Sequence, residues 1–205
     1  MTSKRILVPF AILALAACTV TEKAPTDTAT VAAPESPAVV PADSTPAVDP
    51  APAPPASPVS SWVVNTRGIG PITAGMTVAK ANAASGNALD IPAKMEECDF
   101  VKVKGATDLI MMVEKGTISR VDVARSSTIA TTTGAKIGDT EDRIKSLYPG
   151  VATQPHKYTD GHYLVVTPAA AADKNFRIVF ETDGAKVLRY RSGRVPAVEY
   201  VEGCS

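Results

Sequence analysis

The chain has 205 residues, and its 21 Lys and Arg balance 21 Asp and Glu at a formal net charge of zero. This balance excludes the strongly basic surface that attracts nucleic acid. It also excludes an overall positive electrostatic field that would attract acidic partners. The composition changes along the chain, because 10 of the 17 prolines fall within residues 19–61. The sequence therefore predicts segments of different kinds, with no nucleic-acid partner.

The first segment, residues 1–17, has the features of a secretory signal peptide. Lys4 and Arg5 give it a positive start, and an apolar run from Ile6 to Ala17 follows, interrupted only by Pro9. That run is too short for a membrane-spanning helix, which needs about 20 residues. A basic start, a short apolar run and small residues at its end predict a signal that is cut off after export.

The signal ends on Leu15-Ala16-Ala17-Cys18. This ending resembles the lipobox of bacterial lipoproteins, in which an aliphatic residue and two small residues precede a cysteine. The resemblance implies that the thiol of Cys18 receives diacylglycerol, that the chain is cut before this residue, and that the new amino group is acylated. The alternative is an ordinary cut at Ala14-Leu15-Ala16, which leaves Cys18 as a bare thiol.

Lipidation of Cys18 would decide where the mature chain resides. Each buried CH₂ of an acyl chain contributes about 0.8 kcal/mol, so two or three chains hold a protein on a membrane. Residue 19 is Thr rather than Asp. By resemblance to lipoprotein sorting in Gram-negative bacteria, this implies the outer membrane, on its inner face or at the cell surface.

Residues 18–61 predict a disordered tether that begins at the lipidated cysteine. Beyond Cys18 the segment is rich in Pro, Ala and Thr, and it has no aromatic residue and no sustained period of 2 or 3.6. Such a chain cannot bury enough apolar area to offset its ordering entropy. In an extended polyproline form it would rise by about 3.1 Å per residue and span up to about 100 Å. A proline-rich ligand segment is the alternative.

The remaining residues predict one compact domain of two diverged repeats, 62–126 and 127–205. At an offset of 63 residues, Ile72-Thr73-Ala74-Gly75-Met76-Thr77 aligns with Ala135-Lys136-Ile137-Gly138-Asp139-Thr140. In each copy the threonine stands where a helix N-cap belongs, since its side-chain oxygen can accept from a free amide of the first turn. We expect short helices over residues 77–86 and 140–148.

The other segments of each copy alternate apolar and polar residues, which predicts short strands. The turns Glu114-Lys115-Gly116 and Thr182-Asp183-Gly184 predict hairpins. The expected fold is α+β, with two tandem helix-plus-antiparallel-strand units whose short helices pack on one sheet face. The strands are expected at Phe100–Lys104, Leu109–Val113, Ile118–Val123, Leu164–Val166, Ile178–Phe180, Val187–Arg191 and Val198–Val201.

The repeated helix entry, with Gly75 and Thr77 in one copy and Gly138 and Thr140 in the other, resembles two known folds. One is the tandem fold of the β-lactamase inhibitor protein. The other is the single unit of the small lipoproteins of the outer-membrane β-barrel assembly machinery. The resemblance implies a binding protein, but no contact residue of either family carries over. The lipobox, tether and domain together also resemble envelope lipoproteins that are loosely described as lectins.

Two cysteines remain after Cys18, and an even pair in an exported domain predicts a disulfide between Cys98 and Cys204. This bridge would close a loop of about 107 residues, worth about 4–5 kcal/mol in chain-entropy models. Free thiols are the alternative. A metal site would need more ligands than the two histidines of the chain supply.

A polar cluster runs from His156 to Tyr163, and Asp160-Gly161 within it predicts a two-residue hairpin. Strand alternation would place His156, Tyr158 and Tyr163 on one sheet face and His162 on the other, so no metal site is expected. The three aromatic residues form a candidate binding face; cross-strand packing is the alternative.

Three further residues, all on the predicted strand Val187–Arg191, complete the candidate binding residues: Tyr190, Arg189 and Arg191. The two arginines share a strand face, where they could clamp a carboxylate or phosphate. The alternative is a solvated strand edge that resists aggregation.

No catalytic motif of a serine hydrolase, zinc protease or phosphate-binding loop occurs in the sequence, so we expect no enzyme and no cofactor. The leading hypothesis is a lipid-anchored envelope protein that binds another envelope protein as an inhibitor or adaptor. The alternatives are a carbohydrate- or peptidoglycan-binding protein and a structural spacer.

Overall fold

The computed structural model describes residues 59–124 and 126–204. The predicted signal peptide, the predicted lipidation site Cys18 and the predicted tether up to residue 58 lie outside the described residues. The last three residues of the predicted tether, 59–61, form a 3₁₀ turn. No helix within the described part of the chain is long and apolar enough to cross a membrane.

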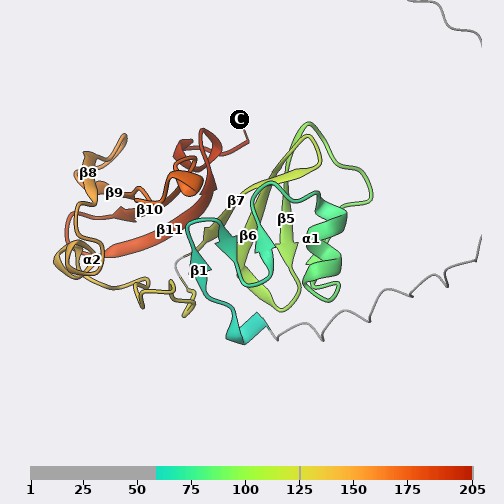
Figure 1. The fold of residues 1–205 in the computed structure, drawn as a ribbon, viewed down its shortest axis with the longest axis horizontal. Coiled ribbons are helices and arrows are strands. Elements are labelled where there is room, and N and C mark those ends of the chain that lie inside the picture. Colours follow the sequence, from blue (N-terminus) through green and yellow to red (C-terminus); the bar gives the residue numbers. More distant parts are fainter. Residues whose placement is uncertain (1–58, 125, 205) are drawn as a thin grey trace, which may run out of the picture. The chain divides into compact units, whose positions relative to one another are not determined.

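One antiparallel sheet of eight strands dominates the described residues (Figure 1). Its spatial order is β4-β5-β6-β7-β11-β10-β9-β8. Strands from the earlier and later parts of the chain therefore meet side by side at β7 and β11. The bounds are β4 Leu89–Asp90, β5 Cys98–Val103, β6 Ala106–Glu114, β7 Thr117–Val123, β8 Ala152–Pro155, β9 His162–Val166, β10 Phe176–Thr182 and β11 Val187–Arg194.

A small second sheet of three very short strands precedes the large one. Its strands are β1 (Val64–Asn65), β2 (Gly68–Ile69) and β3 (Ile72–Thr73), and the one-turn 3₁₀ helix η1 (Val59–Ser61) precedes them. The buried Trp62 ring lies directly over Gly70. A Cβ at Gly70 would lie 2.6 Å from the ring, and the φ of +50° also favours glycine there.

The two α-helices, α1 (Val78–Ala84) and α2 (Glu141–Leu147), begin where the sequence predicts. Thr77 caps α1 by accepting from the Lys80 amide, and Thr140 caps α2 by accepting from the Arg143 amide. Both predicted N-caps are confirmed. The signal is local: a hydroxyl three residues before an unpaired amide needs no tertiary contact to reach it.

Both helices pack into one continuous hydrophobic core on one face of the large sheet. Val78 and Ala81 of α1 and Ile144 of α2 belong to the same buried cluster. The strands contribute alternate residues to this helix-covered face, as a period of two requires, except where the register of the β6–β7 pairing shifts between Met112 and Val113. They include Val101, Val103, Leu109, Met111, Ile118, Val121, Leu164, Ile178, Phe180 and Tyr190.

The opposite face of the sheet carries a smaller cluster of Tyr163, Val165, Val179 and Val198. The C-terminal segment (residues 196–204) covers part of this face, and it includes the 3₁₀ helix η3 (Ala197–Glu199). The strand predicted at Val198–Val201 is therefore wrong. Carbonyl groups of this segment accept hydrogen bonds from arginine side chains of the sheet, so the segment crosses the sheet instead of extending it.

The C-terminal segment is also tied to the sheet covalently, because Cys98 of β5 and Cys204 form a disulfide in the structure. Their Cα atoms are 5.5 Å apart, although 106 positions separate them in the sequence. The predicted cysteine pairing is the one present in the structure.

The fold confirms mixed helix and antiparallel strand content, but the described residues are dominated by their sheets. Two helices of seven residues each accompany the eight-stranded sheet. The turn that leads into each helix is hydrogen-bonded to a strand in the same way. The Gly75 amide donates to the Ile118 carbonyl at 2.7 Å, and the Gly138 amide donates to the Val187 carbonyl at 2.9 Å.

Candidate functional site

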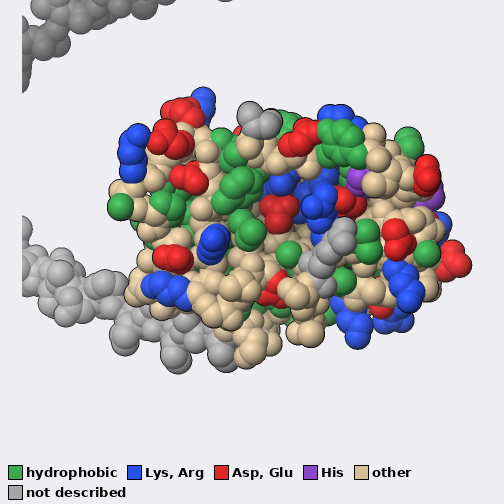
Figure 2. All heavy atoms as spheres, turned by 180° about the vertical axis from the view of Figure 1, so that it is seen from behind, with side chains coloured by type: hydrophobic (Ala, Val, Ile, Leu, Met, Phe, Trp, Pro, Cys, Tyr) green, Lys and Arg blue, Asp and Glu red, His purple; other side chains and the backbone are tan. Residues whose placement is uncertain are grey.

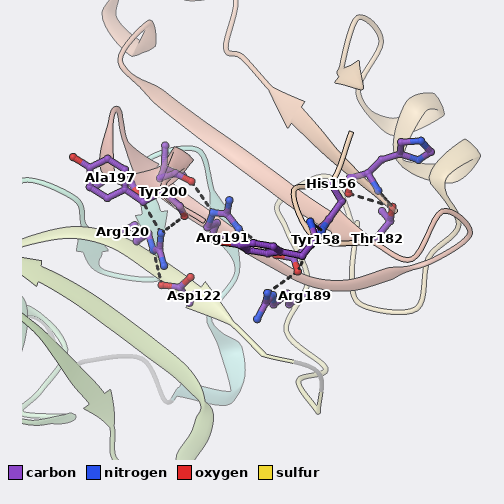
Figure 3. Close-up of polar contacts among 12 residues, drawn as sticks. Arg120, Asp122, His156, Tyr158, Thr182, Arg189, Arg191, Ala197 and Tyr200 are labelled. Carbon is purple, nitrogen blue, oxygen red and sulfur yellow. Dashed lines mark hydrogen bonds and ion pairs between the residues drawn. The ribbon is translucent and has the colours of Figure 1, made fainter. Parts of the chain in front are cut away.

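Buried and half-buried charges gather on the face that the C-terminal segment partly covers. We call Arg120, Arg189 and Arg191 the arginine cluster. Alternation places all three on this face, since Arg120 lies on β7 and the other two lie on β11. Strand pairing sets Arg191 opposite Asp122 and Arg189 opposite Glu181. Figure 3 shows the cluster and its polar contacts.

Arg120 joins the sheet to the C-terminal segment (Figure 3). Its Nε donates to Asp122 at 2.9 Å, and its Nη1 donates to the carbonyls of Ala197 at 3.0 Å and Tyr200 at 2.8 Å. The side chain is 6% exposed. Gly193, its partner on β11, leaves the necessary room, because a Cβ there would lie 2.6 Å from the Arg120 Cα.

Arg191 and Arg189 both contact the buried Glu181 carboxylate. Arg189 Nη2 donates to Oε1 at 2.6 Å, and Arg191 Nη1 donates to Oε2 at 3.4 Å. Burial raises the pKa of Glu181, but hydrogen bonds from Arg189 and His156 and the two guanidinium charges hold it below its usual range. Glu181 is therefore ionised at neutral pH. Arg191 Nε also donates to the Val198 carbonyl at 2.7 Å, so Arg191 is the second arginine that holds the C-terminal segment.

His156 completes the surroundings of Glu181. Its Nε2 lies 3.0 Å from Glu181 Oε1, and its Nδ1 accepts from the Tyr158 amide at 3.0 Å. Because Nδ1 is an acceptor, the contact corresponds to a neutral ring that donates from Nε2. The ring also stacks on Tyr163, with 4.6 Å between the ring centres.

The two-residue hairpin predicted at Asp160-Gly161 is wrong. The last ladder pair is Pro155 with His162, and the His156 amide donates to the Gly161 carbonyl. The connection is thus a wider loop, because side-chain contacts of His156 with Glu181 and Tyr163 hold its entry against the sheet. His162 still lies on the opposite face from His156, as alternation predicts.

The structure does not bring the predicted aromatic face together as an exposed surface. Tyr158 is 61% exposed, but Tyr163 is buried at 7% and Tyr190 at 1%. Tyr190 lies in the helix-covered core, where its hydroxyl donates to the Ile129 carbonyl at 2.8 Å, because it alternates with the arginines of β11. Of the other three candidates, His156 and Arg191 are buried, and the Arg189 side chain is half exposed.

The arginine cluster lines a cavity of about 200 Å³, which we call the arginine cavity. It opens beside the C-terminal segment, over the central strands β7 and β11. Figure 2 shows cationic and acidic side chains gathered at the middle of one face, with hydrophobic side chains beside them. The remaining lining residues are Ile110, Asp122, Val123, Ala124, Tyr190, Val201 and Glu202.

Partly exposed apolar side chains lie on the same face near this cavity. Phe100 of β5 is 37% exposed, Tyr200 is 39% exposed, and Ile110 is intermediate in exposure. A second hollow of about 440 Å³ shares Val201 and Glu202 with the arginine cavity, and it is also lined by Met112, Tyr200 and the disulfide. The part of this face around the arginine cavity thus combines charged and apolar groups.

The two histidines bind different carboxylates on different faces. His156 contacts Glu181, whereas His162 Nδ1 lies 2.8 Å from Glu141 Oε1 at the start of α2. Thr182 donates to the same Glu141 oxygen at 2.6 Å. Burial raises the pKa of Glu141, but hydrogen bonds from Thr182, His162 and Lys145 lower it overall. Over residues 59–124 and 126–204, no group of three or more His, Cys, Asp and Glu is placed to hold a metal ion.

Sequence reasoning missed Arg120, Asp122 and Glu181, although they are the fixed centre of this site. A partial signal was present: Arg120 and Asp122 alternate with Val121 and Val123 within the predicted strand Ile118–Val123, whereas Glu181 comes directly after the predicted strand Ile178–Phe180. A charge in that pattern is ordinarily read as a solvated side chain. The burial here arises because the C-terminal segment returns over the strands, which no local pattern encodes.

Comparison of the chain with protein-family models, with curated proteins and with solved structures finds no match.

Proposed function

We propose that the chain is an exported, lipid-anchored protein of the bacterial outer membrane whose folded part binds another envelope protein. The proposed anchor rests on the Leu15-Ala16-Ala17-Cys18 ending. The pairing of Cys98 with Cys204 agrees with an oxidising compartment. The proposal takes the protein to be an adaptor or inhibitor rather than an enzyme.

The observation that carries the binding proposal is the arginine cavity beside exposed apolar side chains. Protein interfaces combine buried aromatic and arginine anchors with a polar rim. Phe100, Ile110 and Tyr200 supply apolar contact area on this face, and Arg189 supplies a half-exposed guanidinium. On the opposite face the strands are covered by α1 and α2. We therefore place the partner on the part of this sheet face beside the C-terminal segment, around Lys102 of β5, Ile110 of β6 and Asp122 of β7.

We also propose that the two halves of the domain are diverged tandem copies of one helix-plus-strand unit. The equivalent bonds from Gly75 and Gly138 support this, as do the two threonine caps. In the sheet, β4-β5-β6-β7 faces β11-β10-β9-β8 in mirrored order. Two tandem units of this kind are what the resemblance to the β-lactamase inhibitor protein implies; the resemblance leaves open whether they share one sheet.

A photocrosslinking experiment tests the binding surface. A photoreactive amino acid replaces Lys102, which is exposed on β5 and pairs with Ile110, in the full chain in native envelopes. The matched control replaces Asp142, which is exposed on α2 on the other face. We expect one defined protein adduct at Lys102 and none at Asp142. Equal adducts at both positions, or adducts with glycan alone at Lys102, would contradict the proposal.

The anchor is tested separately by Cys18→Ser. The wild-type chain should incorporate labelled palmitate and fractionate with outer membranes, because each CH₂ group of a buried acyl chain contributes about 0.8 kcal/mol to membrane binding. The variant should carry no label. An equal label in the variant would exclude Cys18 as the acceptor.

A further inference from the structure

The arginine cavity contains more hydrogen-bond donors than the protein uses. Within the described part of the chain, Nη2 of Arg120 and Nη2 of Arg191 donate to no protein acceptor, although both side chains are 6% exposed. Toward the described residues, Arg189 uses only Nη2, and only for Glu181. Guanidinium groups carry five donors in a planar fork, so all three arginines retain donors for a ligand.

Among the described residues, the charges around the cavity also leave a positive excess. The cations are Arg120, Arg189, Arg191 and Lys157, and the carboxylates are Asp122, Glu181 and Glu202. Each carboxylate has a close cation of its own: Asp122 has Arg120 at 2.9 Å, Glu181 has Arg189 at 2.6 Å, and Glu202 has Lys157 at 3.2 Å.

Of these four cations, Arg191 has the longest ion-pair contact, which is 3.4 Å from its Nη1 to Glu181 Oε2. Burial and the nearby Arg120 charge lower the pKa of Arg191, despite the opposing effect of Asp122 and Glu181. One additional negative charge at this position would relieve the repulsion between the two buried guanidinium groups. The excess is a single charge, which fits a monoanion better than a phosphate dianion, because Asp122 and Glu202 also line the cavity.

We propose that the arginine cavity receives one carboxylate, from an Asp or Glu side chain of the partner protein. A planar carboxylate matches the fork of Arg189 with two parallel hydrogen bonds, and Nη2 of Arg191 is a further donor. Ile110 and Val201 line the same cavity and offer apolar contact to the methylene groups of such a side chain. This inference rests on the proposed function, because it names the chemistry of the partner at that surface.

Short peptides provide the direct test. The full chain, isotope-labelled at arginine and solubilised in detergent micelles, is titrated with acetyl-Gly-Glu-Gly-amide and with acetyl-Gly-Gln-Gly-amide while the arginine Nε–H resonances are followed by NMR. We expect the Glu peptide to shift the resonances of Arg189 and Arg191 with a Kd on the order of millimolar, and the Gln peptide to leave them unchanged. Equal shifts from both peptides would overturn the inference.

Variants locate the response at the cavity. Arg189→Gln should raise the Kd for the Glu peptide at least about fivefold, because a charge-assisted pair is lost. Arg177→Gln is the matched control, since Arg177 contacts Glu199 and the Lys174 and Phe176 carbonyls and does not line the cavity. An unchanged Kd in Arg189→Gln, or equal loss in both variants, would overturn the assignment.

A second pair of variants does not touch any arginine. Ile110→Glu supplies a carboxylate from the cavity wall and should abolish the response to the Glu peptide, whereas Ile110→Gln should retain it. Glucuronate is titrated in parallel. A lower Kd for glucuronate than for the Glu peptide would show that the cavity prefers the carboxylate of a sugar acid. That result would overturn the proposal that the carboxylate comes from a protein side chain.

The two proposals fail in different ways. A protein adduct at Lys102 together with equal responses to the Glu and Gln peptides would refute the carboxylate site and leave the binding proposal standing. A selective response to the Glu peptide without any protein adduct at Lys102 would refute the protein partner.

Discussion

The two faces of the large sheet receive alternate residues of the same strands, yet they are stabilised in different ways. The helix-covered face is an apolar core that α1 and α2 close. The other face holds Glu181, Arg120 and Arg191, and the C-terminal segment closes part of it through hydrogen bonds and a disulfide. An apolar core offers a ligand no hydrogen-bond donor. A charge cluster whose arginines are incompletely paired still offers such donors. The comparison indicates why binding is expected on the second face.

The largest expected effect comes from removing a large side chain from the helix-covered face. Phe180→Ala should lower the free energy of unfolding by about 3–5 kcal/mol, since Phe180 is fully buried between Tyr148 and Tyr190. Phe100→Ala on the other face, where the ring is 37% exposed, should lower it by less than about 1 kcal/mol. Guanidinium denaturation with the disulfide intact measures both. Equal losses would show that the two faces contribute alike.

Removing the disulfide tests the other face. Cys98→Ser combined with Cys204→Ser should lower the free energy of unfolding by about 2–5 kcal/mol, because the bridge spans 106 positions of the chain. Amide hydrogen exchange of the same variant shows which part of the structure is destabilised. We expect the largest increase at Glu199 and Tyr200, whose amides bond within the C-terminal segment, and a smaller one at Ser85 of the α1 end. A uniform increase would mean that the segment and the helices open together.

The pH dependence compares Glu181 on one face with Glu141 on the other. Burial raises both pKa values, but hydrogen bonds and neighbouring charges bring each below its ordinary value of 4.5. Each carboxylate therefore contributes stability that is present above about pH 4.5 and is lost as the pH falls through its folded pKa.

Glu181→Gln and Glu141→Gln should each lower stability at pH 7, and each should make stability less dependent on pH below about 4.5. The difference from the wild type should narrow toward acid pH. Urea denaturation from pH 7 to pH 3 measures this. A difference that stays constant over that range would mean that the carboxylate has the same pKa folded and unfolded.

The smallest effect compares the two helix caps. Thr77→Ala and Thr140→Ala should each lower the free energy of unfolding by about 1 kcal/mol. The loss should be smaller at Thr140, because Glu141 and Asp142 also favour the α2 start, whereas the first turn of α1 has no acidic residue. Thermal unfolding of both variants measures the difference. A larger loss at Thr140 would argue against this compensation by acidic residues.

Several features of this fold were predictable because their causes are local. A threonine cap acts on an amide three residues away, and alternation puts Arg189 and Arg191 on one face whatever else the chain does. The prediction of mixed helix and strand content rests on the same periodicities.

Other features depended on contacts between distant segments. Alternation shows that Tyr190 and Arg191 point in opposite directions, but it does not say which face the helices cover. The loop after Pro155 widened because His156 found Glu181, 25 positions away. The predicted strand at Val198–Val201 failed because its carbonyl groups found Arg120 and Arg191 as donors.

By itself the sequence determined the helix caps, the strand periodicities, the pairing of two cysteines and the ending that predicts lipidation at Cys18. Only the tertiary structure decided that β7 and β11 join the halves into one sheet and that the C-terminal segment returns across it. The physical reason is that strand pairing and buried charge pairing join groups far apart in the chain. Whether Arg191 is solvated or buried depends on what lies above it, and that cover comes from residues at the end of the chain.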